Sequence, residues 1–344
     1  MKIIDRALTA SVLLAAVGLV SCGGGSSKEA SEVKLQGAGA SFPAPLYSKW
    51  FKNYSGAHPN VQIDYQSVGS GSGVKNFIDK TVDFGASDAA MTAEEIGRVD
   101  AGVQLIPMTA GNIVLTYNVP GVTDLKLPRA AYSGIFLGKV KKWNDPAIAK
   151  ANPGAKLPDS AINVVVRADS SGTTFVFTQH LSAISKEFAA SPGTNKMPAW
   201  PVGTRSKGNE GVTASVQTTP GSIGYIEYGY AISQKMPMAQ LENKSGSFVA
   251  PSTASGQAGL ASAQMPDNLI AWVPDPEAKD AYPIVTYTWL LCYKKYSDPK
   301  KAEVVRDLLA YCLTDGQKES EALGYIPLPD AVVTKVKAAV QNIQ

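Results

Sequence analysis

Apolar positions along the chain follow two spacings in turn. Apolar and polar residues alternate over 61–65, which predicts a strand, and apolar residues recur at helical spacing over 74–82. The same succession returns as an apolar strand at 163–166 and a helical pattern over 177–188. A turn rich in small residues separates the strand from the helix in both cases. Strand–turn–helix units of this kind predict an α/β fold with ligands bound at the turns.

Two further helices have recognisable first residues. Ser41 precedes Pro43 and an apolar face that recurs until Gly56, so we expect Ser41 to N-cap a helix. Thr92 and Glu95 are spaced as a capping box, which predicts a second helix start.

The last sixty residues predict one more strand, at 284–293, and helices near 301–313 and 330–342. The pattern does not say which earlier block these elements join. Cys292 lies in the strand and Cys312 on the apolar face of the first helix. We expect two buried free thiols, although an exported protein would also permit a disulfide.

The N-terminus has the features of an export signal. A short positive segment precedes an apolar stretch at 7–20, which is too short for a confident membrane span. The stretch ends in Leu-Val-Ser-Cys, which resembles the bacterial lipobox, so we expect a lipoprotein signal peptide at 1–21 and acylation of Cys22. An ordinary signal peptide with an incidental cysteine is the alternative. Residues 22–33 are mostly small and polar, which is typical of a flexible tether.

Composition and charge narrow the class of partner. The 344 residues are 44% hydrophobic and 18% charged, with a net charge of +3, which is typical of a soluble globular protein. Near-neutrality and the lack of a basic run give no reason to expect nucleic acid binding. The two histidines, His58 and His180, form no cluster with cysteines, so we expect no metal site and no cofactor. His180 shares an apolar helix face and is expected to be packed rather than catalytic.

Three turns rich in glycine and serine point to an anion. They are GAGASFPAP (37–45), SVGSGSGV (67–74) and RADSSGTTF (167–175). Small residues at a helix start let backbone N–H groups approach a negative ligand, where the helix dipole also favours it. Side-chain hydroxyls and backbone N–H groups are the candidate donors, and they come from Ser41, Phe42, Ser70, Ser171, Gly172 and Thr173. Arg167 can add a bidentate contact, with Asp169 holding its guanidinium.

Asp88, in VDFGASDAA, is the candidate acceptor. A carboxylate repels an anion unless the ligand donates a proton to it. Phosphate keeps at least one proton near neutral pH, whereas sulfate has none, so Asp88 would accept a hydrogen bond from phosphate and reject sulfate. The alternative is that Asp88 only caps the next helix, but Thr92 and Glu95 already supply that cap.

Several long motifs resemble the phosphate-binding proteins of bacterial high-affinity phosphate ABC transporters. These motifs are GAGASFPAPLYSKW, YQSVGSGSGVKNF, TVDFGASDAAM, GKVKKWNDPAIAKANPG, VVRADSSGTTFVF, KGNEGV and PGSIGYIEYGYA. The likeness runs from about Leu35 to the C-terminus. It implies that phosphate is bound by Ser41, Phe42, Ser70, Asp88, Arg167, Ser171, Gly172 and Thr173, with Asp169 orienting the arginine. Ser41 and Ser170 stand where some members have Thr and Gly respectively.

The resemblance also implies a two-lobed periplasmic-binding-protein fold of type II, with the ligand in a cleft between lobes joined by a two-strand hinge. Lobe I would combine 34–108 with 285–344, and lobe II would be 109–284. The chain would cross between them near 107–109 and 283–285. The implied partners are inorganic phosphate and the permease subunits of an ABC importer, with the protein a monomer outside the cytoplasm, in the periplasm or on the cell surface.

Two other functions stay open on the sequence alone. A secreted phosphate-ester hydrolase could keep the same anion site, but it would need a nucleophile or metal that no motif supplies. An adhesion protein on a lipid tether would leave the three turns without a ligand. Gly203 to Gly208 have the spacing of a P-loop, but Asn209 stands where its lysine should be, so nucleotide binding is not predicted.

Overall fold

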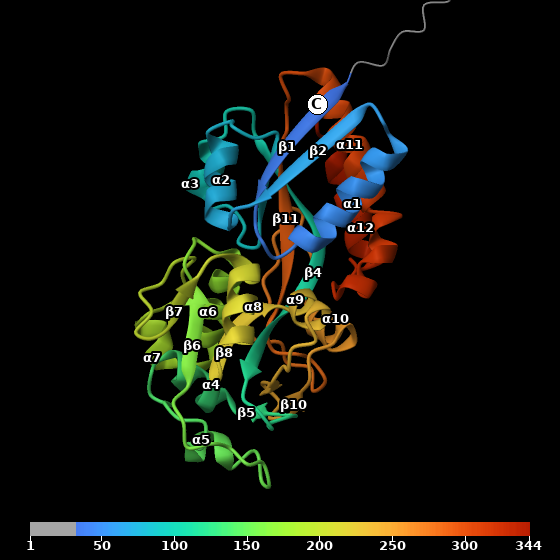
Figure 1. Ribbon diagram of the computed structural model, residues 1–344. Helices are drawn as coiled ribbons and strands as arrows, with labels where there is room; N and C mark the ends of the chain where they lie inside the picture. Colours follow the sequence, from blue (N-terminus) through green and yellow to red (C-terminus); the bar gives the residue numbers. More distant parts are fainter. Residues whose placement is uncertain (1–31) are drawn as a thin grey trace, which may run out of the picture. The chain divides into compact units, whose positions relative to one another are not determined.

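The computed structural model describes residues 32–344 (Figure 1). The expected signal peptide, the acylated Cys22 and nearly all of the expected tether lie outside these residues. The strands are β1 (Val33–Gly39), β2 (Val61–Ser67), β3 (Phe84–Ser87), β4 (Val103–Asn118), β5 (Lys126–Leu127), β6 (Asn163–Arg167), β7 (Thr204–Ser206), β8 (Ser222–Glu227), β9 (Gln240–Glu242), β10 (Phe248–Val249) and β11 (Val285–Tyr293).

Helices follow most of the strands. They are α1 (Ala44–Ala57), α2 (Ser70–Ile78), α3 (Ala93–Gly97), α4 (Arg129–Phe136), α5 (Pro146–Ala149), α6 (Gly172–Ile184), α7 (Lys186–Ala190), α8 (Gly208–Thr218), α9 (Tyr228–Ser233), α10 (Thr253–Leu260), α11 (Pro299–Cys312) and α12 (Asp330–Val340), with short 3-10 turns at Gly316–Glu319 and Glu321–Leu323. The α/β class predicted from the apolar spacing is therefore confirmed.

One mixed sheet organises the described residues, with strand order β2-β1-β3-β11-β4-β8-β6-β7. Strands β2, β1 and β3 run parallel, and so do β8, β6 and β7. Between these groups lie β11 and β4, which are antiparallel to each other and to their outer neighbours (Figure 1). The carboxyl ends of the parallel strands in each group therefore meet at one edge, where ligands bind in α/β sheets.

The two central strands carry the connection between the groups. Strand β4 is 16 residues long and pairs with both β11 and β8. Its pairing with β11 shifts register between Thr288 and Trp289, opposite Thr109 and Pro107, so Met108 forms a bulge. The predicted crossing at 107–109 lies at this bulge, and the predicted crossing at 283–285 lies at the start of β11.

Three local expectations differ from the structure in detail. Ser41 does not cap α1: the helix begins at Ala44 after Pro43, which makes no side-chain cap. The helical pattern of 74–82 ends at Ile78, because Lys80 adopts a left-handed backbone (φ 58°). The pattern of 177–188 forms two helices, because Ser185 ends α6 and its side chain caps α7. The capping box at Thr92 is confirmed.

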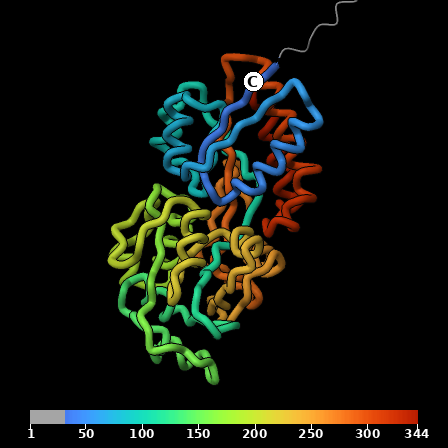
Figure 2. The backbone as a smooth tube through the Cα atoms, viewed as in Figure 1, coloured from blue at the N-terminus to red at the C-terminus, as the bar shows by residue number. Residues whose placement is uncertain are grey.

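The C-terminal elements join the first block of the chain. Figure 2 shows the C-terminal helices beside the N-terminal segment, and Trp50 Nε1 donates to the Gly316 carbonyl at 2.7 Å. The strand and both helices predicted for this region are confirmed. Cys292 and Cys312 are buried free thiols, as expected, and burial raises the pKa of Cys292 to about 12. Within residues 32–344, every helix is too short or too polar to cross a membrane.

Candidate anion-binding site

The predicted site residues gather in one buried cluster, although they come from distant parts of the sequence. Each follows the carboxyl end of a parallel strand: Ser41 and Phe42 follow β1, Ser70 follows β2, and Asp88 follows β3. Arg167 is the last residue of β6, and the turn after it leads into α6. All of the side chains are 3% exposed or less, namely those of Ser41, Phe42, Ser70, Asp88, Arg167, Ser171 and Thr173.

The start of α6 supplies backbone donors. Ser171 is its N-cap and accepts a hydrogen bond from the Thr174 N–H at 3.0 Å. The first N–H groups of a helix have no partner within it, and here they belong to Gly172 and Thr173. Close packing requires glycine at 172, since a Cβ there would lie 2.4 Å from Ser70 Oγ. This helix start therefore directs its N–H groups at the cluster.

Asp88 is the acidic member of the cluster. Its Oδ1 accepts a 2.8 Å hydrogen bond from Thr288 Oγ1, and its Oδ2 accepts a long one, 3.4 Å, from Thr173 Oγ1. Burial raises the pKa of this carboxyl to about 7, although the Thr288 hydroxyl and the Arg167 guanidinium favour its charged form. Near neutral pH the group can therefore either accept or donate a proton at its less engaged oxygen, Oδ2.

Arg167 is fixed by Asp169. Its Nε and Nη2 donate to the two carboxylate oxygens at 2.8 and 2.5 Å, and Asp169 Oδ1 also accepts from the Gly208 N–H at 3.0 Å. Burial raises the pKa of Asp169, but these donors outweigh it and leave the pKa below its usual value. The remaining nitrogen, Nη1, is buried without a protein partner. A buried guanidinium nitrogen in this state is a strong donor for an anion.

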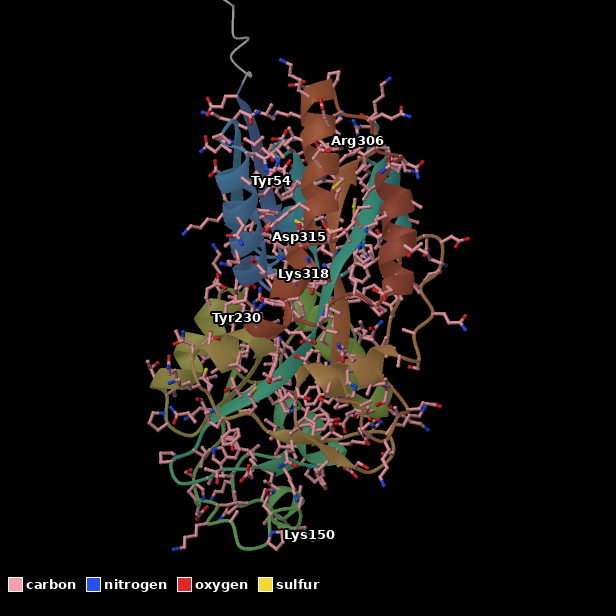
Figure 3. The ribbon with its side chains drawn as sticks, turned by 90° about the vertical axis from the view of Figure 1, so that its right-hand side faces the viewer. Tyr54, Lys150, Tyr230, Arg306, Asp315 and Lys318 are labelled. Carbon is pink, nitrogen blue, oxygen red and sulfur yellow. The ribbon has the colours of Figure 1, made fainter. Side chains whose placement is uncertain are left out.

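Tyrosine hydroxyls hold the 40–42 turn in place. Tyr65, Tyr230 and Tyr325 each donate a 2.7 Å hydrogen bond to a carbonyl of the turn, those of Ala40, Ser41 and Phe42 respectively. Tyr230 lies where α9 approaches the first turn of α1 (Figure 3). These bonds occupy the carbonyl oxygens, so the turn keeps its acceptors away from the cluster.

Two contacting residues were not predicted from the sequence. Asn209, at the start of α8, bonds to Ser41 Oγ through both its backbone N–H (3.0 Å) and its Nδ2 (2.9 Å). Thr288 reaches Asp88 from β11. Asn209 follows a strand and a glycine, as Ser70 does, which is a usable pattern. Nothing local distinguishes Thr288, because it lies in a fully buried strand.

A second carboxyl lies beside the cluster. Glu227 is fully buried; its Oε2 accepts from the Gly229 N–H at 2.8 Å, and its Oε1 has no partner. Burial raises the pKa of this carboxyl well above its usual value. Burial therefore favours the neutral, protonated form of Glu227 over the charged one.

His180 is a packed residue, as expected. Its Nε2 contacts the Tyr132 hydroxyl at 2.9 Å, its Nδ1 contacts the Pro274 carbonyl at 2.7 Å, and burial lowers its pKa to about 4. Among residues 32–344, no three His, Cys, Asp or Glu side chains are grouped so that they could hold a metal ion.

Comparison with known proteins identifies the family. Residues 25–315 match the model of the PBP superfamily domain. The "Phosphate-binding protein PstS" of Pasteurella multocida is 43% identical over 88% of this chain and 89% of its own length. The protein of the same name from Methanocaldococcus jannaschii is 38% identical over 96% of this chain and 93% of its own. The chain belongs to the periplasmic phosphate-binding protein family.

Solved structures of the family share the fold. A high affinity periplasmic phosphate-binding protein, PfluDING, solved with bound phosphate, matches with a TM-score of 0.74 at 21% identity, over 89% of this chain and 93% of that one. The phosphate-binding protein of Stenotrophomonas maltophilia gives 0.71 at 23% identity, over 89% and 94%. The predicted two-lobed fold of this family is therefore confirmed.

Proposed function

We propose that this protein captures inorganic phosphate and delivers it to an ABC importer. The observation that carries the proposal is a buried pair of complementary groups, the unpartnered Nη1 of Arg167 and the Oδ2 of Asp88. Such a pair suits an anion that also carries a proton. The phosphate-binding relatives, at up to 43% identity, support the same ligand.

The protonation state of the ligand explains the selectivity that we propose. Backbone and hydroxyl donors replace the water that a small oxyanion loses on burial. Asp88 Oδ2 then pairs with the one oxygen of phosphate that carries a proton. Sulfate would face an unpaired buried carboxylate, which costs about 1–3 kcal/mol or more.

We assign the ligand contacts to the eight predicted residues, with Asp169 as the partner of Arg167. Lobe I would supply Ser41, Phe42, Ser70 and Asp88, and lobe II would supply Arg167, Ser171, Gly172 and Thr173. Hydrogen bonds between the two proposed lobes support closure over the ligand. They include the Gly71 N–H to the Ser170 carbonyl at 2.9 Å and Asn209 to Ser41. Ligand that contacts both lobes would stabilise the closed state.

Titration calorimetry of the full chain tests the proposal. We expect phosphate to bind and sulfate to bind at least about 100-fold more weakly, because only sulfate leaves the carboxylate unpaired. Equal affinity for the two anions, or none for phosphate, would reject the function. A phosphatase assay with and without divalent metal is the companion measurement. Turnover of a phosphate ester would favour the hydrolase, which the binding-protein relatives do not support.

We further propose that the protein works outside the cytoplasm, anchored through acylated Cys22. The support is the Leu-Val-Ser-Cys sequence after an apolar stretch, followed by a polar tether. Cys22→Ala should release the protein from the membrane fraction of its native host, since the acyl chains would be lost. Retention of the variant in that fraction would contradict the anchor and leave phosphate binding untouched.

A further inference from the structure

Asn209 is fully buried and lies between Ser41 and Thr173 of the anion-binding cluster. Its Oδ1 accepts the Glu227 N–H at 2.9 Å. Because a backbone N–H can only donate, this bond fixes which end of the amide is oxygen. The Nδ2 group is therefore turned to the other side, where it donates to Ser41 Oγ at 2.9 Å and to Thr173 Oγ1 at 3.3 Å.

The hydrogen bonds that the Ser41 hydroxyl accepts leave it able only to donate one more. A serine hydroxyl has two acceptor positions and one proton. Both acceptor positions of Ser41 are occupied, one by the Asn209 backbone N–H at 3.0 Å and one by Nδ2. Its proton must then be donated to a group other than Asn209. At Thr173 the Nδ2 proton occupies one acceptor position, and the hydroxyl proton makes only the long 3.4 Å contact to Asp88 Oδ2, which a closer oxygen of the anion can replace.

The position of Asn209 is itself set by the Arg167 partner. Gly208 precedes it with a left-handed backbone (φ 70°), and the Gly208 N–H donates to Asp169 Oδ1 at 3.0 Å. This left-handed backbone favours glycine at 208, because a side chain is strained there. The same turn thus connects the guanidinium partner to the amide that contacts Ser41.

We propose that Asn209 is a positioning residue that makes the Ser41 and Thr173 hydroxyls hydrogen-bond donors toward the bound anion. The proposal rests on the proposed function. With both hydroxyls committed as donors, Asp88 Oδ2 is the acceptor left for the ligand, so an anion with a proton at that one oxygen satisfies every group. Asn209 belongs to proposed lobe II and Ser41 to lobe I, so the same amide also makes this arrangement depend on lobe closure.

The test compares Asn209→Ala with Asn118→Ala by calorimetry with inorganic phosphate, on the full chain. Asn118 is a matched control, since its Nδ2 also makes two hydrogen bonds, to the Val216 and Gln217 carbonyls at 3.0 and 2.9 Å, away from the cluster. Loss of two hydrogen bonds that orient ligand donors should weaken phosphate binding by Asn209→Ala about 100-fold. Asn118→Ala should stay within about threefold of the wild type.

Thermal unfolding without phosphate separates positioning from general support of the fold. A merely structural role would lower the Tm of ligand-free Asn209→Ala and leave the Kd of its folded molecules within about tenfold of the wild type, which would overturn the proposal. Asn209→Asp is a second test variant, and its side chain has nearly the same size as that of asparagine. Its carboxylate keeps the bond from the Glu227 N–H but draws both hydroxyl protons away from the anion.

We expect Asn209→Asp to bind phosphate more weakly than Asn209→Ala, and equal or tighter binding would also overturn the proposal. A wild-type protein that does not bind phosphate would reject the proposed function instead, whatever the variants do.

Discussion

Asp88→Asn should reduce the preference for phosphate over sulfate by about 100-fold, because the variant removes the buried charge that sulfate cannot pair. The amide oxygen would keep the 2.8 Å hydrogen bond from Thr288, and the amide N–H groups would replace the acceptor that faces the ligand. Sulfate would then gain a donor, and phosphate would lose its acceptor. Calorimetry with both anions at pH 8 measures the ratio of the two Kd values.

The wild-type protein itself should show the same effect through pH. Burial raises the pKa of Asp88 to about 7, so above that pH the carboxyl must take up a proton before sulfate can bind. Sulfate affinity should therefore fall by up to about tenfold for each pH unit above the pKa and level off below it. Asp88→Asn has no such proton to take up, and its sulfate affinity should be flat over the same range. An unchanged phosphate-to-sulfate ratio in the variant would contradict the proton-acceptor role of Asp88.

The elements and turns that place the site were predictable because their causes are local. Alternation over 61–65 and helical spacing after 69 identify β2, α2 and the turn between them from neighbouring residues alone. The same holds for β6, α6 and the turn at 167–173. Since β1 and β2 are parallel neighbours, the turns after them lie at the same sheet edge, as the spacing predicts. The pairing through β11 and β4 that brings the turn after β6 to them is not predictable from the spacing.

The site contacts that the sequence did not predict are made between residues far apart in the chain. Serine is a preferred N-cap residue, but the Ser41 Oγ bonds to Asn209, 168 residues away. Helix α1 begins without a cap from Ser41. Asn209 lies in the motif KGNEGV and fails the P-loop pattern, but neither feature predicts its contact with Ser41. Thr288 becomes part of the site because β11 inserts between β3 and β4, a pairing that no local pattern specifies. These contacts follow from topology, which residue spacing does not encode.

Arg167→Met should abolish phosphate binding, with a loss of about 1,000-fold or more, because it removes a charge-assisted donor from a buried site. It should also lower the free energy of unfolding by a few kcal/mol, because the partly buried Asp169 would lose its charged partner and keep only the Gly208 N–H donor. The side chains of the pair are 1% and 11% exposed, so solvent screens neither charge effectively. Calorimetry with phosphate measures the loss of affinity. Urea unfolding in the absence of phosphate measures the loss of stability.

The double variant Arg167→Met with Asp169→Asn separates these losses. The amide that Asp169→Asn introduces keeps an acceptor for the Gly208 N–H, which Asp169 now accepts at 3.0 Å, but carries no charge that needs the guanidinium. The double variant should therefore regain most of the stability lost in Arg167→Met. It should regain none of the phosphate affinity, because Nη1 is still missing from the cluster. If phosphate binding recovers together with stability, Arg167 affects binding only by holding the turn in shape. That result would contradict the assignment of Arg167 as a direct phosphate contact.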